Sequence, residues 1–574
     1  MQMESSENKQ NKKVNVRKRN MISLLFSLLI IIAVNMIGAR TFTRIDLTSE
    51  KRFTLTDATK DLLRELDDIV YFRVYLEGDF PAGFRRLRNQ TREMLDEFRA
   101  YSPMIQYEFI NPTHQGDWER SESNYKMLVE KGLQPTQLQI QAEDASSQQI
   151  VFPGALVSYR DNELPLSLLQ DQMGLSSDNV LNNSAQALEY NLAFTIHKLT
   201  VTEKPTVAFL QGQGELDFRY VADITYELED FYQVKRLSIN GDVGALDDVN
   251  TLVVAQPMEP FTEVDKFVID QFIMRGGSVL WLVDPVFASM DSLQVATETM
   301  GMAWPLNLDD MFFRYGVRVN TNLLTDLQAV PIPVTTGYSG NRPQISMIPW
   351  YFFPMARPAS RHPVVNNLNA IRTEFVSSID TVEAAGISKT VLLTTSNYTR
   401  VLNTPARISF DLMHSRPDER LYQDGPHAVA VLLEGAFNSV FQNRIPPLQN
   451  LPVDFQQMDK GTFSRMIIVS DGDVIRNQFD SQGSPLPLGY DRFLDETFGN
   501  KDFILNAINY LNDDAGIIEA RAREVRLRLL DNSRINHDKF KIQLVNVALP
   551  LIFILIFALL RFFWRKKKYN KKIV

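Results

Sequence analysis

Two long apolar segments, one near each end of the chain, constrain its fold most strongly. Met21–Gly38 and Leu544–Leu560 contain no charged side chain, and the second run continues past Arg561 to Phe562, Phe563 and Trp564. An α-helix needs about 20 consecutive apolar residues to cross a bilayer. We therefore predict transmembrane helices at residues 21–38 and 544–564, with a large folded module between them.

Basic residues flank both apolar runs on their outer sides. The expected topology anchors are Arg17, Lys18 and Arg19 before the first run, and Arg561, Arg565, Lys566, Lys567 and Lys568 around the end of the second. Because short segments rich in Lys and Arg stay in the cytoplasm, the tails at residues 1–20 and 565–574 are expected there. Two crossings then place the central region on the other side of the membrane, which in a bacterium is the periplasm or the outer surface; we expect a protein of the bacterial inner membrane with a periplasmic central region.

Two other interpretations of these runs remain open. The first run could be a cleaved signal peptide, although Arg40 and Phe42 follow it in place of a small-x-small cleavage site. The second could be a buried core helix, but a terminal apolar run that ends in a Lys cluster is typical of a tail anchor. Pro550 in this run is tolerated in membrane helices.

The composition excludes several classes of function. The chain has 574 residues, a net charge of -9 and no cysteine. Since the tails are basic, the central region is acidic, which disfavours nucleic-acid binding. Without cysteine there are no disulfides, thiol catalysis or Cys-ligated zinc. The six histidines are scattered without metal-ligand spacing. We predict no catalytic residues and no cofactor.

Residues 45–200 have the pattern of an α/β domain. Alternating or apolar stretches predict strands, and amphipathic stretches predict helices. The expected elements, in chain order, are a helix Asp57–Leu66 with Thr56 as N-cap, a strand Val70–Leu76, a helix Phe84–Ala100, a strand Ile105–Ile110, a helix Ser121–Lys131, strands Leu138–Gln141 and Ile150–Tyr159, the latter paired with Glu163–Leu166, and a helix Asn183–Leu199. This order predicts a thioredoxin-like α/β domain. It lacks the Cys-x-x-Cys pair of redox enzymes.

A basic cluster lies on the second expected helix of this domain. Arg85, Arg86 and Arg88 follow one another closely in the sequence. They could form a surface for a partner protein. A solvated helix face is the alternative, and the residues alone favour it.

Residues 205–300 and 462–514 are expected to form one doubly wound α/β domain. Near-continuous apolar runs that alternate with helices predict a parallel sheet. The runs are Thr206–Leu210, Val234–Leu237, Leu252–Ala255, Ser278–Val283 and Met466–Val469, with helices at Tyr220–Phe231, Phe261–Met274 and Asn500–Leu511. Residues 301–461, rich in Pro and aromatics, form an inserted or companion subdomain with strands at Val391–Thr395 and Ala428–Glu434. Residues 517–540 are expected to form a juxtamembrane helix.

Candidate ligand-binding residues lie where the expected strands end. Gly212, Gly214 and Glu215 follow the first strand and Asp284 follows the fourth, and ligands of doubly wound sheets sit at the carboxyl ends of strands. A dinucleotide site is rejected, because the third glycine is missing and Glu215 would repel a phosphate. The alternative interpretation is a tight turn that uses glycine for its backbone freedom.

Asp471 and Asp473 are candidate metal ligands. They flank a glycine directly after the expected strand Met466–Val469. Two carboxylates at a strand end could hold a divalent cation. An acidic turn after a strand is the alternative, and it is the commoner case.

Several segments together resemble a known family. They are Lys51–Thr56 (KRFTLT), Phe209–Glu215 (FLQGQGE), Gly276–Pro285 (GGSVLWLVDP), His362–Leu368 (HPVVNNL) and Ser470–Asn477 (SDGDVIRN). Their order and spacing resemble the gliding-motility-associated GldG family, the auxiliary or substrate-binding components of an ABC transporter. The resemblance covers nearly the whole chain. The family's Gly-His-Gly-Glu turn reads Gly-Gln-Gly-Glu here, with Gln213 in place of the histidine.

The resemblance implies a complex with a multi-spanning ABC permease and a cytoplasmic ATPase. This chain has no Gly-x-x-x-x-Gly-Lys-Ser/Thr loop, so it is not the ATPase. The leading hypothesis is a non-catalytic, membrane-anchored periplasmic subunit that couples the permease and ATPase to its exported module. One alternative is a solute-binding receptor. A hydrolase-like enzyme is the third, and it lacks a Cys nucleophile and any His in a catalytic setting.

Overall fold

The computed structural model divides the chain into two compact units, residues 1–54 and 55–574. It describes residues 21–33, 35–36, 54–113, 118–142, 145–169, 176–201, 203–340, 342–413, 417–448, 455–513, 516–522 and 532–570. In the first unit the described residues form a short apolar helix at Met21–Ala33. Part of the predicted span 21–38, and the anchors Arg17, Lys18 and Arg19, lie outside these ranges.

One helix in the described part of the chain is long and apolar enough to cross a membrane. It is the segment Gln543–Lys567 of α12, which spans Asn532–Asn570. None of its side chains is buried in this segment, as expected for a surface that faces lipid. The predicted C-terminal span at residues 544–564 lies within it, with Pro550 inside the helix. Within the predicted first span, the described residues include a shorter apolar helix at Met21–Ala33.

The first domain is built on a four-stranded sheet in the order β2-β1-β5-β6. β1 is parallel to β2 and antiparallel to β5, and β5 is antiparallel to β6. The strands are β1 (Val70–Val74), β2 (Ile105–Phe109), β5 (Gly154–Tyr159) and β6 (Asn162–Ser167), with a separate hairpin of β3 (Thr136–Ala142) and β4 (Ala145–Val151). The helices are α2 (Asp57–Arg64), α3 (Ala82–Tyr101), α4 (Trp118–Glu130), α5 (Ser177–Gln186) and α6 (Leu188–Thr200).

Local chemistry explains the start of this domain. The Thr56 hydroxyl accepts a hydrogen bond from the backbone N–H of Thr59, and its own N–H donates to the Glu189 carboxylate at 2.6 Å. A Thr N-cap of this kind stabilises a helix by about 1 kcal/mol. In β1 the buried positions alternate. They pack with α3 residues Phe84 and Leu95 in one core.

Two expected elements of this domain are each divided in the structure. The predicted strand Ile150–Tyr159 is interrupted after Val151, because Pro153 has no N–H to contribute to a ladder. The predicted helix Asn183–Leu199 falls across α5 and α6, which meet at Ala187.

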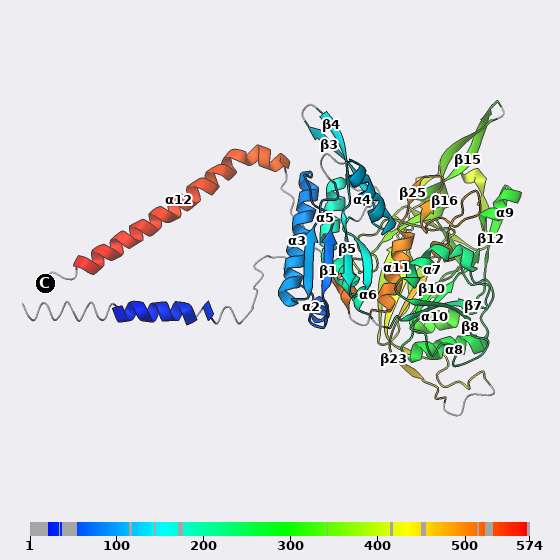
Figure 1. The fold of residues 1–574 in the computed structure, drawn as a ribbon. Helices are drawn as coiled ribbons and strands as arrows, with labels where there is room; N and C mark the ends of the chain where they lie inside the picture. Colours follow the sequence, from blue (N-terminus) through cyan, green and yellow to red (C-terminus); the bar gives the residue numbers. More distant parts are fainter. Residues whose placement is uncertain are drawn as a thin grey trace, which may run out of the picture. The chain divides into compact units, whose positions relative to one another are not determined.

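The second domain is built on a ten-stranded sheet. Its path is β15-β16-β19-β22-β23-β10-β9-β7-β8, and β17 pairs with β16 beside this path. The five adjacent strands β23, β10, β9, β7 and β8 are parallel to one another. Beyond β23, the strands β22, β19, β16 and β15 continue the sheet through antiparallel pairs (Figure 1). The strands are β7 (Thr206–Gln211), β8 (Gln233–Ser238), β9 (Thr251–Ala255), β10 (Ser278–Leu282), β15 (Ala329–Ser339), β16 (Arg342–Pro358), β17 (Ile371–Arg372), β19 (Ile387–Thr394), β22 (Ala428–Asn438) and β23 (Lys460–Val469).

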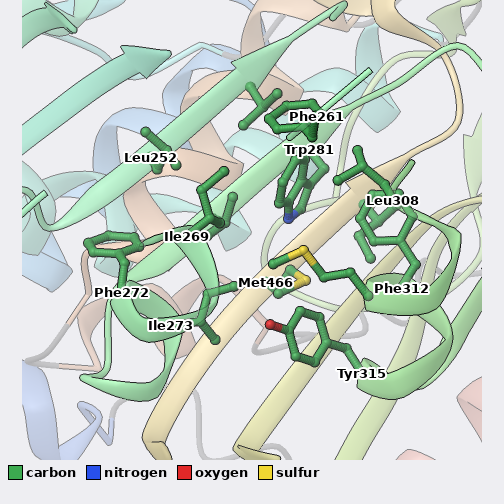
Figure 2. Close-up of a cluster of buried hydrophobic side chains, with 14 of the residues drawn as sticks. Leu252, Phe261, Ile269, Phe272, Ile273, Trp281, Leu308, Phe312, Tyr315 and Met466 are labelled. Carbon is green, nitrogen blue, oxygen red and sulfur yellow. The ribbon is translucent and has the colours of Figure 1, made fainter. Parts of the chain in front are cut away.

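The parallel strands are covered on both faces. Alternate residues of β9 and β10 point to opposite sides, so Val254 and Trp281 pack with α8 (Glu263–Met274) and α10 (Asp309–Tyr315). Their neighbours pack with α7 (Ala222–Glu229) and α11 (Asn500–Leu511). Figure 2 shows Trp281 among Phe261, Leu308 and Phe312. Each fully buried large apolar side chain contributes about 1.5–3 kcal/mol.

The expectation of an all-parallel sheet is corrected. β23 joins β10 in parallel, as the apolar run Met466–Val469 suggests. Strands β16, β19 and β22, however, come from residues 301–461 and extend the same sheet in antiparallel order. A buried apolar run such as Ala428–Glu434 has the same composition in either direction of pairing, so composition does not distinguish them.

The remaining elements connect these strands or follow them. They are η1 (Phe218–Tyr220), β11 (Val286–Phe287), α9 (Met290–Val295), β12 (Glu298–Ala303), β13 (Val317–Val319), β14 (Asn322–Asp326), β18 (Ile379–Thr381), β20 (Thr399–Asn403), β21 (Ala406–Ser409), η2 (Phe410–Met413), η3 (Glu419–Leu421), η4 (Gly472–Ile475), β24 (Tyr490–Asp491), β25 (Glu496–Thr497) and η5 (Ile517–Ala522). The predicted helix at residues 517–540 begins as the short 3₁₀ helix η5, and residues 523–531 lie outside the described part.

Candidate functional site

A cavity of about 1140 Å³ lies at the carboxyl ends of β9, β10 and β23. Gln256, Asp284 and Asp473, which follow these three strands, line it. Parallel strands end at one edge of the sheet, so residues distant in sequence meet there. Arg372 and Glu374, which follow β16 and belong to or adjoin β17, complete the charged floor.

Asp284 is held by two neighbours from different strand ends. Its Oδ1 accepts from the backbone N–H of Gly472 at 2.6 Å, and its Oδ2 accepts from Nε2 of Gln256 at 2.7 Å. Gln256 has a backbone φ of 54°, a conformation that costs a non-glycine residue free energy and concentrates at functional sites. The strained Gln256 backbone therefore directs an amide at a carboxylate in the cavity wall.

Asp471 and Asp473 have different roles, although one residue separates them. Asp471 is fully buried, and its two oxygens accept from the backbone N–H groups of Asp473 and Glu374 at 2.8 and 2.7 Å. It caps η4 and is absent from the cavity lining. Asp473 lines the cavity and forms an ion pair with Arg476 at 3.0 Å.

The geometry at this pair is that of a hydrogen-bonded turn. Within the described ranges, no three His, Asp or Glu side chains gather in an arrangement that could hold a metal ion. Asp471 uses both oxygens for backbone donors, and Asp473 faces Arg476. The alternative interpretation, an acidic turn after a strand, accounts for these contacts.

Arg372 is the centre of a second ion-pair group. Its two terminal nitrogens donate to Glu374 and Asp491, each at 2.8 Å. Asp491 is 4% exposed at its side chain, so this group anchors β24 to the cavity floor. Sequence reasoning missed Arg372, Glu374 and Asp491, because no local motif marks them and the two segments are far apart in the chain.

The floor has more carboxylates than cations. Burial raises the pKa of Asp284 to about 7, and the nearby Asp473 and Glu374 act in the same direction. Burial likewise raises the pKa of Glu374 to about 7, although Arg372 opposes the change. Asp284 and Glu374 keep some exposed surface, because they face the cavity. They therefore lie deep in the protein with part of their surface open to the cavity.

The glycine loop after β7 closes on itself. Gly212 and Gly214 have φ of 126° and 72°, which only glycine adopts readily. The Glu215 carboxylate accepts from the backbone N–H of Gln213 at 2.8 Å, and burial raises its pKa. Gln213 in turn donates its amide to Asp265 at 3.1 Å. These contacts match the tight-turn alternative.

The structure therefore separates the four predicted ligand residues. Asp284 lines the cavity, whereas Gly212, Gly214 and Glu215 do not. The next residue, Leu216, does reach the wall. The loop thus borders the cavity through its last part.

Aromatic rings and guanidinium groups next to Asp473 contact one another in series, beginning with Arg476. Arg476 lies over the ring of Tyr220 at 4.8 Å from Cζ to centroid. Tyr220 meets Phe479 edge to face at 5.3 Å, and Arg219 lies over Phe479 at 4.6 Å. Such cation–π contacts contribute about 0.5–1 kcal/mol at exposed sites. All four side chains line the cavity.

The basic cluster on α3 belongs to the first domain, whereas the cavity lies in the second. Arg88 pairs with Glu77 at 2.8 Å, and Arg86 donates to the Asn182 side chain at 3.2 Å. Arg85 is exposed. Two of the three arginines therefore serve contacts within their own domain, and a partner surface would rest mainly on Arg85.

Similarity to known proteins gives the family of the chain. A family model described as ABC-type uncharacterized transport system matches residues 204–507. The chain belongs to this family. The match spans the whole cavity and continues without a break through residues 301–461. A second model, a domain of unknown function, matches residues 49–158.

Membership of the ABC-type uncharacterized transport system family implies an accessory role alongside ABC transporter components. Together with the apolar segment Gln543–Lys567, it indicates membrane association. An uncharacterized protein of Borreliella burgdorferi is 21% identical over 542 residues, covering 92% of this chain and 94% of that protein. The mmIFT52 N-terminal domain is 12% identical, with a TM-score of 0.30 over 54% of this chain and 97% of that domain. That score is too low to bear on the fold.

The described lining of the cavity is rich in groups that can bind a ligand. Its described lining has carboxylates, guanidinium groups, amides and aromatic rings, and it has no histidine. A nucleophile needs a base within hydrogen-bond reach, and the hydroxyl of Ser289 in the described lining accepts a hydrogen bond from the backbone N–H of Asp291.

Proposed function

We propose that this protein is a non-catalytic, membrane-anchored subunit of an ABC transporter complex of the gliding-motility type, a member of the GldG group. It couples a permease and a cytoplasmic ATPase to its folded module. The observation that carries the proposal is the transport-system match over residues 204–507 on a chain that also has the apolar segment Gln543–Lys567. The five segments from Lys51–Thr56 to Ser470–Asn477 support the assignment to gliding motility.

The proposed topology has two spans, with both termini in the cytoplasm and the central region in the periplasm of the inner membrane. The basic groups at Arg17–Arg19 and Arg561–Lys568 support it through the positive-inside rule.

Single cysteines test this topology. Because the chain has no cysteine, single cysteines report their location without background. Ser484→Cys should react with an impermeant maleimide on spheroplasts, and Ser5→Cys and Tyr569→Cys should react only after lysis. Labelling of Ser5→Cys before lysis, or an N-terminus shortened by a signal peptidase, would contradict two spans.

The fold details of the proposal follow from strand order. The order β2-β1-β5-β6, with one parallel and two antiparallel pairs, supports a thioredoxin-like domain within residues 45–200. The parallel block from β23 to β8 supports a doubly wound core formed by residues 205–300 and 462–514. Residues 517–540 would lead from this core to the membrane helix.

Co-purification tests the complex. The full-length chain, tagged and extracted in mild detergent, should bring down a multi-spanning permease and an ATPase with a Gly-x-x-x-x-Gly-Lys-Ser/Thr loop. A variant that lacks residues 544–574 is the matched control, since it keeps both folded domains and loses the span. Recovery of the full-length chain as a lone monomer would contradict the proposal.

A solute receptor is the second candidate, and the cavity favours it. Its volume of about 1140 Å³ lies slightly above the ~300–1,000 Å³ range of small-molecule sites. Its position at the carboxyl ends of parallel strands is where doubly wound sheets bind ligands. A ligand that binds the folded state must raise the melting temperature of the solubilised chain. The absence of any such shift across a solute library would contradict this role and leave the complex untouched.

A further inference from the structure

The cavity presents carboxylates and guanidinium groups at different places, and this separation identifies a class of ligand. The geometry points to a short peptide that places a lysine or arginine side chain at Asp284 and its terminal carboxylate at Arg219. This inference rests on the receptor candidate, and it does not depend on the permease or the ATPase.

Asp284 is the carboxylate in the floor that lacks a cationic partner within the described chain. The two nearby guanidinium groups are engaged elsewhere, Arg372 by Glu374 and Asp491, and Arg476 by Asp473. Each oxygen of Asp284 accepts one hydrogen bond. A carboxylate oxygen can accept two, so both oxygens of Asp284 have capacity for a ligand donor.

Asp284 is also held in a fixed position. Gln256 from the end of β9 and Gly472 from η4 donate to it from two sides. Gly472 has no room for a side chain, because an added Cβ would lie 2.6 Å from Cβ of Gln256. A carboxylate oriented in advance loses little entropy when it binds a cation, and this favours affinity.

The charge of the floor calls for a cation. On the floor, the carboxylates of Asp284, Glu374, Asp473 and Asp491 outnumber the guanidinium groups of Arg372 and Arg476, while Asp291, Arg219 and Arg492 line other parts of the cavity. A ligand cation that arrives at Asp284 would offset this excess. An ammonium or guanidinium group would make a charge-assisted hydrogen bond there, which is stronger than a neutral one.

Two further arginines provide the opposite charge. Arg219 and Arg492 are exposed and line the same cavity, and neither has an ion pair within the described residues. Arg219 lies over Phe479, and Nη1 of Arg492 donates to the Phe479 carbonyl at 2.9 Å. A stacked guanidinium keeps its edge free for a carboxylate. Phe479 therefore contacts both arginines, and Arg219 stacked on its ring is available for the anionic end of a ligand.

Apolar side chains fill much of the remaining wall. Phe287, Trp304, Phe353, Phe410 and Met413 line the cavity from the side of β11, β16 and η2. This surface suits apolar side chains next to a charged group, and aromatic rings also attract cations. The volume exceeds what one amino acid needs. A peptide of a few residues supplies a cation, apolar side chains and a carboxylate at once.

The test uses the full-length chain in detergent and a defined peptide library. The probe is a set of N-acetylated pentapeptides with lysine first, alanine, leucine or phenylalanine elsewhere, and a free carboxylate. Matched sets carry norleucine in place of lysine, or an amide in place of the carboxylate. We expect affinity-selection mass spectrometry to retain the lysine set, and calorimetry to give about tenfold or greater weakening for either replacement, since a charged hydrogen bond is lost.

Variants assign each charge to its residue. Asp284→Asn should abolish the preference for lysine over norleucine, and Arg219→Gln should abolish the preference for carboxylate over amide. Asp161→Asn, which changes an exposed residue of the first domain, should bind like the native chain. Arg219 is exposed, so its variant tests the proposal even where Asp284→Asn fails to fold.

Three outcomes would overturn the inference. The first is retention of neither lysine nor norleucine peptides by the folded chain. The second is equal binding of the two sets, and the third is charge preferences that survive Asp284→Asn and Arg219→Gln. Each of these leaves co-purification with a permease unaffected, so a failure here is distinct from a failure of the proposed complex.

Discussion

The backbone N–H of Gly472 lies 2.6 Å from Oδ1 of Asp284, across 188 positions of the chain. This hydrogen bond joins the end of β10 to the turn after β23, at the end of the parallel block that borders the antiparallel strands. It also fixes the carboxylate that faces the cavity. The packing of one glycine and the geometry of the candidate site therefore depend on each other.

Replacing this glycine should weaken the fold. In Gly472→Ala the new Cβ would meet Cβ and Cγ of Gln256 at 2.6 Å and Oδ2 of Asp284 at 3.0 Å. Overpacking of this kind costs about 1–3 kcal/mol. We expect a lower melting temperature by circular dichroism. The control Gly337→Ala, whose Cβ would come no closer than 3.7 Å to the Gln344 side chain, should change little, and equal effects of the two would contradict the packing argument.

Asp284 and Glu374 should make stability fall with rising pH. Their pKa values are raised to about 7 in the folded protein, against about 4 in an unfolded chain. The folded state thus binds more protons between pH 4 and 7, and the stabilisation present below pH 4 is lost as pH rises through 7. Asp473, Asp471, Asp491, Arg372 and Arg476 face this pair.

Melting temperatures measured from pH 4 to 8 check this prediction. The native chain should lose thermal stability over this range, and Asp284→Asn should lose less because one titrating group is gone. The exposed Asp161→Asn should keep the native slope. A native slope in Asp284→Asn would mean that other groups control the dependence.

Asp270 joins α8 to the antiparallel half of the sheet. Its carboxylate is fully buried and accepts from Tyr315 Oη at 2.8 Å, Ser439 Oγ at 2.6 Å and the Val440 N–H at 2.9 Å. Asp270→Ala leaves these buried donors without an acceptor. Each costs about 1–3 kcal/mol, so we expect a loss of about 3 kcal/mol or more in denaturant unfolding. The exposed Asp248→Ala should stay within about 0.5 kcal/mol, and a similar result for Asp270→Ala would rule out this role.

Lys198 should give a pH dependence of opposite sign. Its Nζ lies 3.2 Å from the centroid of Phe231 and 4.4 Å from that of Phe194. Burial lowers its pKa to about 7, although Glu227 and Asp230 oppose the change. Between pH 7 and about 10 the unfolded chain binds more protons, so stability rises with pH.

The variant Lys198→Met should remove this rise between pH 7 and 10. The control Lys204→Met changes a neighbouring exposed lysine that donates to the Glu229 carbonyl at 2.9 Å, and it should keep the rise. Melting curves at pH 7, 8.5 and 10 distinguish the two. An unchanged rise in Lys198→Met would show that this lysine stays charged in the fold.

Local pattern was enough to find the parallel core. The apolar runs at Thr206–Leu210, Leu252–Ala255 and Ser278–Val283 coincide with β7, β9 and β10. These strands are buried on both faces, so every residue in them must be apolar or satisfied, and the signal is strong. The same logic placed Asp284 and Asp473 at strand ends, where the cavity formed.

The antiparallel half of the sheet and the position of Glu374 depend on strand pairing between distant segments, which no local sequence pattern indicates. β15 and β16 form a long hairpin of Pro- and aromatic-rich sequence (Figure 1). Pro331 and Pro333 obscure its strand signal, because proline is normally excluded from sheets. Glu374 lies in the floor only because β17 pairs with β16 and the Glu374 N–H meets Asp471. The glycine loop carried an apparent ligand motif whose polar groups the fold uses internally.

The parallel pairing of β10 with β23 also means that β10 waits for its partner strand while the chain is being synthesised. At ~5–20 residues per second, a ribosome needs roughly 10–40 s to produce the 188 positions that separate Asp284 from Gly472. During that time β10 has an unpaired edge, which is a template for other chains. Nascent or truncated chains that end before residue 460 should therefore aggregate most readily, and they are the natural clients of chaperones.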